Sequence, residues 1–194
     1  MLGGMRVIAG EFRSRRLETP HGMATRPTSD KLRETLFNVL GASVAGAKVV
    51  DLYAGSGAVG IEAISRGAEF VWFAEKAPSA VAAIRANLRA LKIAGGYALE
   101  DRGVARLLES LAKKARADVD VVFLDPPYEA ADEYKRTMEF LSSHAEMMAE
   151  GAVVIAEHAR KQSLPEAFGE LKRVRVLEQG DAALSFYRQA SITD

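Results

Sequence analysis

The chain has 194 residues, 48% of them hydrophobic and 27% charged, which is long and apolar enough to bury one hydrophobic core. It contains no cysteine, which excludes disulfides and thiolate metal sites. Its 26 basic and 26 acidic residues give a net charge of zero, and no apolar run reaches the roughly 20 residues that span a bilayer. We therefore expect a soluble, cytoplasmic protein without a signal peptide.

The N-terminal segment differs in charge from the rest of the chain. Residues 1–33 contain seven basic and three acidic residues, a net charge of +4, so the remainder carries −4. A basic end on a neutral body is compatible with binding to phosphate, but a solvated basic hairpin without a partner explains the charge equally well. The candidate RNA contacts in this segment are Arg6, Arg13, Arg15, Arg16 and Arg26.

Residues 1–25 form the first predicted unit. Within it, residues 5–9 and 15–18 have the pattern of two short strands, which indicates a β-hairpin extension followed by a loop. Thr28 or Ser29 then caps a helix whose apolar residues recur at helical spacing. We expect residues 26–194 to form the main domain.

From residue 48 onwards, predicted strands alternate with predicted helices. The strands are residues 48–52, 70–75, 96–100, 119–125 and 151–158, and the helices are 57–66, 78–93, 103–115 and 133–149. This alternation predicts an α/β, Rossmann-like sheet that is mostly parallel. Residues 173–188 predict a closing antiparallel hairpin that turns at Gly180-Asp181.

A glycine loop follows the first of these strands. Gly55, Gly57 and Gly60 spell G-x-G-x-x-G, and Glu75 ends the next strand about 20 residues later. In a parallel sheet both fall at the carboxyl ends of strands, where ligands bind. A carboxylate there can accept both hydroxyls of a ribose, so the pattern fits NAD and S-adenosylmethionine alike.

Asp51 favours the second of these cofactors. It lies four residues before the first glycine, near the position that a pyrophosphate would occupy, and like charges repel. S-adenosylmethionine carries an ammonium and a sulfonium instead of a phosphate, and a carboxylate suits both. The simpler alternatives are that Asp51 caps the following turn and that Glu75 faces water.

The second motif is "FLDPPYE", which ends the predicted strand 119–125. Pro126 and Pro127 stiffen the loop and remove two amide donors, so that Asp125 and the Pro126 carbonyl present acceptors. Two acceptors that hold both hydrogens of a nucleobase amine free its lone pair for attack on a sulfonium methyl, while Tyr128 stacks on the ring. The alternative is an ordinary Asp-Pro turn.

The motifs "MRVIAGEFRSRRLETP", "TRPTSDKLRETLFNVL", "DLYAGSGAVGIEA", "DVVFLDPPY", "VVIAEH" and "LSFYR" occur in this order over nearly the whole chain. Together they resemble the RsmD family of bacterial 16S ribosomal RNA guanine-N2 methyltransferases, which depend on S-adenosylmethionine. The resemblance implies a seven-stranded methyltransferase sheet with an N-terminal β-hairpin. It also implies methylation of one guanine in small-subunit RNA, within an assembled or assembling particle.

The resemblance also implies roles for individual residues. It makes Asp125, Pro126, Pro127 and Tyr128 the base-amine site, and it places Asp51 near the methionine end of the cofactor and Glu75 on its ribose. Asp101 is the expected contact to the adenine amine, with Glu100 as the alternative. Arg26 and Thr28 would flank the site. The expected cofactor-binding set is Asp51, Tyr53, Gly55, Gly57, Glu75, Lys76, Asp101 and Thr28.

Other functions remain open on the sequence. The D-P-P-Y motif also serves enzymes that act on adenine N6 or cytosine N4, and the glycine loop alone would suit a nicotinamide-dependent oxidoreductase. A catalytically silent RNA-binding module is a third alternative. His21, His144 and His158 show no ligand spacing, so we expect no metal site. We also expect no membrane contact and a monomer.

Overall fold

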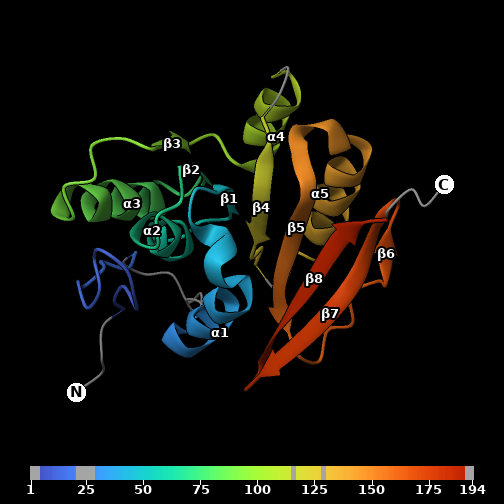
Figure 1. The fold of residues 1–194 in the computed structure, drawn as a ribbon, viewed down its shortest axis with the longest axis horizontal. Helices are drawn as coiled ribbons and strands as arrows, with labels where there is room; N and C mark the ends of the chain where they lie inside the picture. Colours follow the sequence, from blue (N-terminus) through green and yellow to red (C-terminus); the bar gives the residue numbers. More distant parts are fainter. Residues whose placement is uncertain (1–4, 21–28, 115–116, 128–129, 191–194) are drawn as a thin grey trace.

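One mixed sheet organises the part of the chain that the structure describes, which is residues 5–20, 29–114, 117–127 and 130–190 of a computed structural model (Figure 1). Its eight described strands lie in the order β3-β2-β1-β4-β5-β8-β7-β6. The first five in that order are parallel, whereas β8 runs antiparallel to β5. The strands are β1 Lys48–Leu52, β2 Phe70–Ala74, β3 Tyr97–Glu100, β4 Val119–Leu124, β5 Met148–Ala159, β6 Ala167–Phe168, β7 Leu171–Gln179 and β8 Ala182–Gln189.

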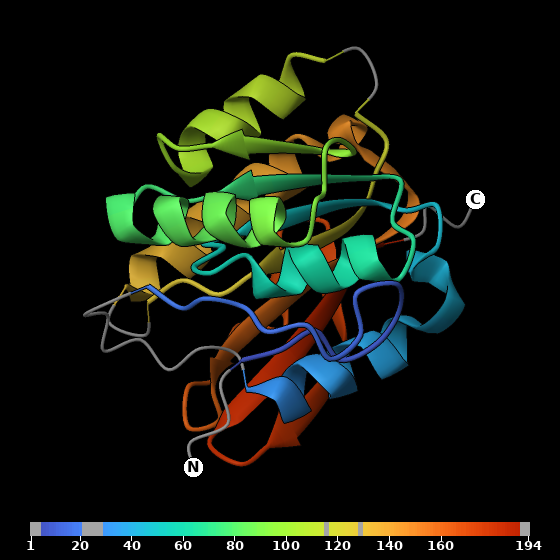
Figure 2. The ribbon, with the colours of Figure 1, turned by 90° about the vertical axis from the view of Figure 1, so that its left-hand side faces the viewer.

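Helices cover both faces of this sheet (Figures 1 and 2). One apolar core joins the sheet to α1 Asp30–Leu40, α2 Ala58–Ser65 and α3 Pro78–Ala90, and a second joins it to α4 Val104–Ala112 and α5 Ala131–Ser143. Neighbouring residues of a central strand pack into the cores on opposite faces of the sheet, as Val49 and Val50 of β1 do. This two-sided burial explains the nearly continuous apolar sequence of the central strands.

Local signals start the helices as the sequence predicts. The Ser29 hydroxyl accepts the Leu32 N–H at the start of α1, so Ser29 rather than Thr28 makes the described cap. Pro78 occupies the first turn of α3, where its missing N–H costs nothing. Gly57, at φ +76°, turns the chain into α2. No helix among the described residues is long and apolar enough to cross a membrane.

The largest difference from the predicted boundaries lies between α5 and β5. The helix expected over residues 133–149 ends at Ser143, a short 3-10 turn covers Ala145–Met147, and β5 begins at Met148, earlier than expected. The His144 ring stacks on Phe140 with centroids 4.0 Å apart and closes the helix. The sheet also has one strand more than the seven expected, because the two-residue β6 is too short to leave a periodic signal.

The N-terminal segment, residues 5–20, forms an antiparallel loop rather than two regular strands. Its only assigned bridge among the described residues joins Arg6 to Arg16, and the Leu17 N–H bonds to the Met5 carbonyl at 2.9 Å. Met5, Val7 and Leu17 are buried in the core shared with α1, α2 and α3. The predicted hairpin is therefore confirmed as a chain reversal, but it packs as part of the main body.

Candidate functional site

The register of the sheet brings four predicted site segments to one edge. Leu52 of β1 lies beside Ala74 of β2 and Leu124 of β4, and Ala74 lies beside Glu100 of β3. The residues that follow these four strand ends are Tyr53, Glu75, Asp101 and Asp125. Tyr53 and Asp125 flank the point where the strand order reverses, between β1 and β4, which is the usual position of a ligand site in such a sheet, and Glu75 and Asp101 follow the next two strands along the same edge.

The glycines of the loop have different roles. Gly55 and Gly57 adopt left-handed backbone conformations, at φ +56° and +76°, which residues with a side chain rarely adopt. Gly60 lies within α2, where an added Cβ would stand 2.2 Å from the Phe73 ring. The first two glycines therefore shape the loop, and the third lets α2 approach β2 closely.

Asp51 supports this loop from beneath. Its side chain is buried, and its carboxyl Oδ2 accepts the Gly60 N–H at 2.8 Å. Burial is the main cause that raises the pKa of Asp51 to about 8. The hydrogen bond from Gly60 lowers this pKa, and the Glu75 carboxylate makes the smallest contribution, which raises it. Burial thus favours the protonated form of this acid under the loop.

Glu75 faces the loop from the end of β2. One carboxylate oxygen accepts the Gly55 N–H at 2.9 Å, and the other accepts the N–H groups of Lys76 and Ala77 at 2.7 and 2.9 Å. These backbone donors fix the carboxylate at the mouth of the loop. The Lys76 side chain is exposed and runs past Gly103. A Cβ added at Gly103 would lie 3.5 Å from the Cβ of Lys76.

The two candidates for the adenine contact both carry ion pairs. Asp101 pairs with Arg85 at 2.8 Å, and Glu100 pairs with Arg102, also at 2.8 Å. The Arg102 bond lowers the pKa of Glu100. Glu100 ends β3 and Asp101 follows it, so both carboxylates lie at the site edge.

Tyr53 connects the glycine loop to the opposite face of the sheet. Its backbone is in the left-handed region, at φ +60°, and its hydroxyl lies 2.8 Å from a Glu133 carboxylate oxygen and 2.9 Å from the Thr137 hydroxyl. Burial raises the pKa of Tyr53. The hydroxyl thus ties the loop to α5, the helix that follows the proline corner.

The proline corner begins at Asp125, which is half-buried and whose N–H reaches the Leu52 carbonyl at 3.4 Å. Pro126 is buried and Pro127 is exposed. The Ala130 N–H bonds to the Pro127 carbonyl at 2.8 Å, which turns the chain into α5. Tyr128, Arg26 and Thr28 lie outside the described residues.

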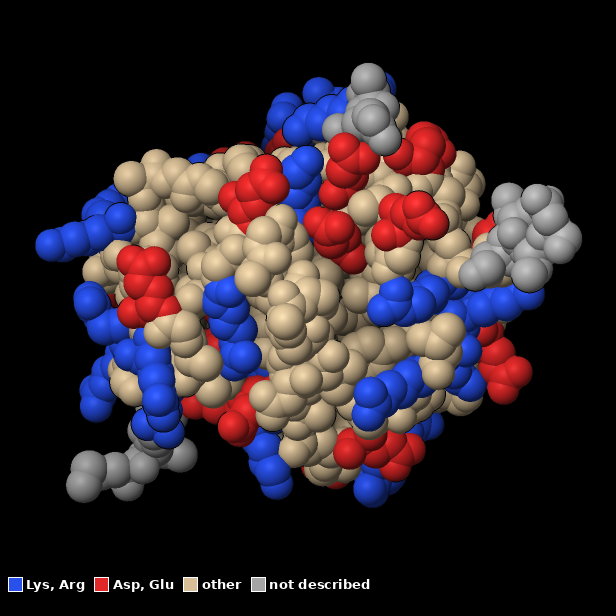
Figure 3. Space-filling view, viewed as in Figure 1, with Lys and Arg blue, Asp and Glu red and all other residues tan. Residues whose placement is uncertain are grey.

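Four of the five predicted RNA contacts are exposed on the N-terminal segment: Arg6, Arg13, Arg15 and Arg16. Arg6 lies near Asp30, and Arg15 donates to the Ala90 carbonyl at the end of α3. Figure 3 shows basic side chains projecting from the side of the molecule where this segment lies. His158 is buried and its ring bonds to the Ser185 hydroxyl at 2.9 Å, so it has a structural partner.

The sequence reasoning missed a set of buried polar side chains beside this site. Among the charged residues, Arg33 and Glu62 are fully buried, and the amide of Asn87 is almost so. Glu62 could have been noticed, because it interrupts the apolar run "AVGIEAIS". Arg33 and Asn87 stand in ordinary amphipathic helices and gave no comparable signal.

Comparison with known proteins assigns the family. The family model described as "Conserved hypothetical protein 95" matches residues 5–188. "Putative rRNA methyltransferase YlbH" of Bacillus subtilis is 34% identical over 185 residues, which are 95% of this chain and 99% of the relative. "Ribosomal RNA small subunit methyltransferase D" of Escherichia coli K12 is 30% identical over 187 residues, 96% and 91% of the two chains.

The fold agrees with solved structures. "Putative methyltransferase yhhF from Escherichia coli" superposes with a TM-score of 0.78 at 30% identity, over 96% of this chain and 98% of that chain. "Putative methylase HI0767 from Haemophilus influenzae" gives a TM-score of 0.76 at 26% identity, over 96% of this chain and 99% of that chain. The chain therefore belongs to the RsmD family, whose model carries the description Conserved hypothetical protein 95.

Proposed function

We propose that this protein transfers a methyl group from S-adenosylmethionine to the exocyclic N2 amine of one guanine in small-subunit ribosomal RNA. The observation that carries the proposal is the sheet register, which sets the Asp125 corner beside the loop that Glu75 faces. The names of the relatives in Bacillus subtilis and Escherichia coli support ribosomal RNA methylation as the class of activity. The choice of guanine N2 as the acceptor atom comes from the resemblance of the sequence motifs to the RsmD family.

The cofactor loop suits S-adenosylmethionine better than a dinucleotide. Loops that cradle phosphate use free backbone N–H groups. Here the Gly55 N–H already donates to the Glu75 carboxylate, so the loop presents negative charge where a pyrophosphate would need donors. Glu75 keeps lone pairs for ribose hydroxyls. We assign Asp51, which is buried, to holding the loop beneath the methionine end of the cofactor.

The proline corner would prepare the nucleophile. Asp125 and the Pro126 carbonyl each accept one hydrogen of the guanine amine, which draws its lone pair out of conjugation with the ring. When bound, S-adenosylmethionine supplies an electrophilic methyl group whose bond to sulfur breaks as the new bond to nitrogen forms. The amine then loses one proton to solvent or to Asp125. Tyr128, by its position in the motif, would stack on the base.

The acceptor RNA would contact the exposed arginines of the N-terminal segment. Arg13 and Arg16 are exposed and carry positive charge toward solvent, as phosphate binding requires. RNA recognition depends on shape as well as on bases, so the substrate is a folded small subunit or an assembly intermediate. We propose that the enzyme acts on it as a monomer in the cytoplasm.

The test is methylation of small subunits that lack the modification. The protein is incubated with these subunits and labelled S-adenosylmethionine, and the digested RNA is examined by mass spectrometry. We expect one labelled N2-methylguanine at a single position. Label on adenine N6 or cytosine N4 would show that the acceptor is one of these amines and not guanine N2. Saturable NADH binding without S-adenosylmethionine binding, measured by calorimetry, would instead favour the oxidoreductase.

A further inference from the structure

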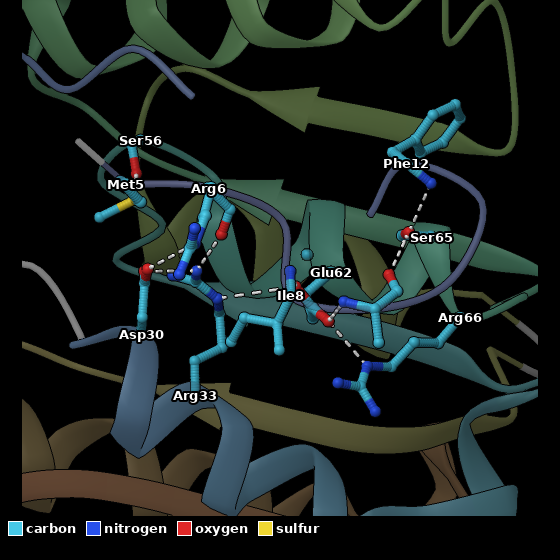
Figure 4. Close-up of polar contacts among 12 residues, drawn as sticks. Met5, Arg6, Ile8, Phe12, Asp30, Arg33, Ser56, Glu62, Ser65 and Arg66 are labelled. Atoms are coloured by element: carbon cyan, nitrogen blue, oxygen red, sulfur yellow. Dashed lines mark hydrogen bonds and ion pairs between the residues drawn. The ribbon is translucent and has the colours of Figure 1, made fainter. Parts of the chain in front are cut away.

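A buried polar network fastens the N-terminal segment to the helices beneath it (Figure 4). The two Glu62 carboxylate oxygens accept the N–H groups of Ile8 and Ala9 at 2.7 and 3.0 Å. Ser65 accepts the Phe12 N–H at 2.9 Å and donates to the Ala9 carbonyl. These bonds satisfy backbone N–H groups that the hydrogen bonds within the segment leave unpaired.

Arg33 holds the same segment from α1. It is fully buried, donates to the Arg6 carbonyl and to Asp30, and its Nε lies 3.8 Å from the Glu62 carboxylate. Among the described residues its Nε and Nη1 have no hydrogen-bond partner. The carboxylates of Asp30 and Glu62 therefore compensate the charge of a guanidinium that hydrogen bonds satisfy only in part.

A second point of attachment reaches the glycine loop itself. The Asn87 side chain, 1% exposed on α3, donates to the Ser56 carbonyl and to the Glu18 carbonyl, both at 3.0 Å, and accepts the Glu18 N–H at 2.7 Å. Ser56 stands between Gly55 and Gly57, and its hydroxyl donates to the Met5 sulfur at 3.3 Å. One buried amide thus joins the loop to the segment that carries the exposed arginines.

We propose that Asn87 is a positioning residue that couples RNA binding to cofactor binding. This inference rests on the proposed function, which assigns RNA to the N-terminal segment and the cofactor to the loop. The Asn87 amide donates one hydrogen bond to the segment, at the Glu18 carbonyl, and one to the loop, at the Ser56 carbonyl. A shift of either the segment or the loop therefore breaks a buried hydrogen bond. RNA that holds the segment in this position would therefore also hold the loop in place.

Coupling of this kind is reciprocal. If a bound cofactor fixes Ser56 and thereby the segment, it tightens RNA binding by the same factor by which RNA tightens cofactor binding. A typical coupling is about tenfold. Neither ligand needs to touch Asn87 for this effect, because the residue acts through the two backbones that it joins.

The test measures the affinity of the protein for unmodified small subunits with and without S-adenosylhomocysteine, which cannot react. For the wild type we expect about tenfold tighter binding with the nucleoside. Asn87→Ala is expected to reduce this factor to about one. It should also raise KM for subunits more than it lowers kcat, while S-adenosylhomocysteine affinity without RNA changes little.

Ser65→Ala is the matched control, because it weakens the docking of the same segment at Phe12, away from the loop. It should lower stability but keep the coupling. If Asn87→Ala does not fold, Asn87→Asp decides, since it keeps an acceptor for the Glu18 N–H and loses both donors. Full coupling in a folded Asn87 variant, or none in an active wild type, overturns the inference. Failure of the wild type to methylate any subunit would overturn the proposed function instead.

Discussion

The cofactor edge and the docked N-terminal segment are held together in different ways. At the cofactor edge, backbone N–H groups bind carboxylates that stand at strand ends, as Gly55 does with Glu75, 20 residues apart. The N-terminal segment is held by buried side chains more than 50 residues away, such as Glu62 on Ile8 and Asn87 on Glu18. The chemistry thus relies on local loops, whereas the placement of the basic segment depends on tertiary packing.

Breaking the docking network should give the largest effect. Glu62→Gln leaves the buried Arg33 with only the partly exposed Asp30 carboxylate as a countercharge, and we expect the free energy of unfolding to fall by about 3–5 kcal/mol. The measurement is denaturant unfolding followed by circular dichroism. Glu139→Gln, in an exposed pair with Lys135, is the control and should cost less than about 1 kcal/mol. Equal losses in the two variants would contradict the central place of Glu62.

Breaking the cofactor edge should affect turnover instead. We expect Asp125→Ala to lower kcat by about 100-fold or more, because the amine loses a positioning acceptor. The free energy of unfolding and the affinity for S-adenosylmethionine should change little. Asp132→Ala, which removes an exposed carboxylate in the first turn of α5, should keep full activity. Single-turnover methyl transfer and calorimetry separate these quantities.

The Asp51 carboxyl sharpens the comparison through pH. Its pKa is about 8 in the folded protein against 3.8 for an ordinary Asp, so the folded state binds the proton more tightly. This contribution to stability is complete below about pH 4 and is lost as the pH rises toward 8, by up to about 1.4 kcal/mol per pH unit. Asp51→Asn should flatten that slope between pH 5 and 8, since its amide oxygen still accepts the Gly60 N–H. Parallel curves of unfolding free energy against pH for the two proteins would show that Asp51 does not cause this pH dependence.

The tie between the loop and α5 should have the smallest effect. Tyr53→Phe removes one hydroxyl that bonds to Glu133 and Thr137, and we expect a loss of about 1 kcal/mol in unfolding free energy. Thermal unfolding would measure it. Tyr97→Phe is the control, because Tyr97 also packs against the core but its hydroxyl makes no hydrogen bond to any residue that the structure describes. A larger loss in the control would show that the tie adds nothing.

The sequence predicted best what local patterns determine. The apolar run of β4, the glycine turn and Asp125 all lie within short stretches, and the structure brings them to one edge. The end of α5 was misplaced because Met147 and Met148 continue an apolar spacing that a helix and a buried strand share. The Asn87 and Arg33 contacts could not be predicted, because each depends on a segment that is distant in the chain.

The burial of Met5, Val7 and Leu17 has a consequence for engineering. The segment that carries the arginines also supplies side chains to the core under α1 and α2, so it cannot be exchanged as a detachable module. A graft from a relative would have to match those three apolar positions, and also Gly10, where a Cβ would stand 1.8 Å from the Ser65 carbonyl oxygen. Retargeting this protein to another RNA is therefore a problem of core design as much as of surface charge.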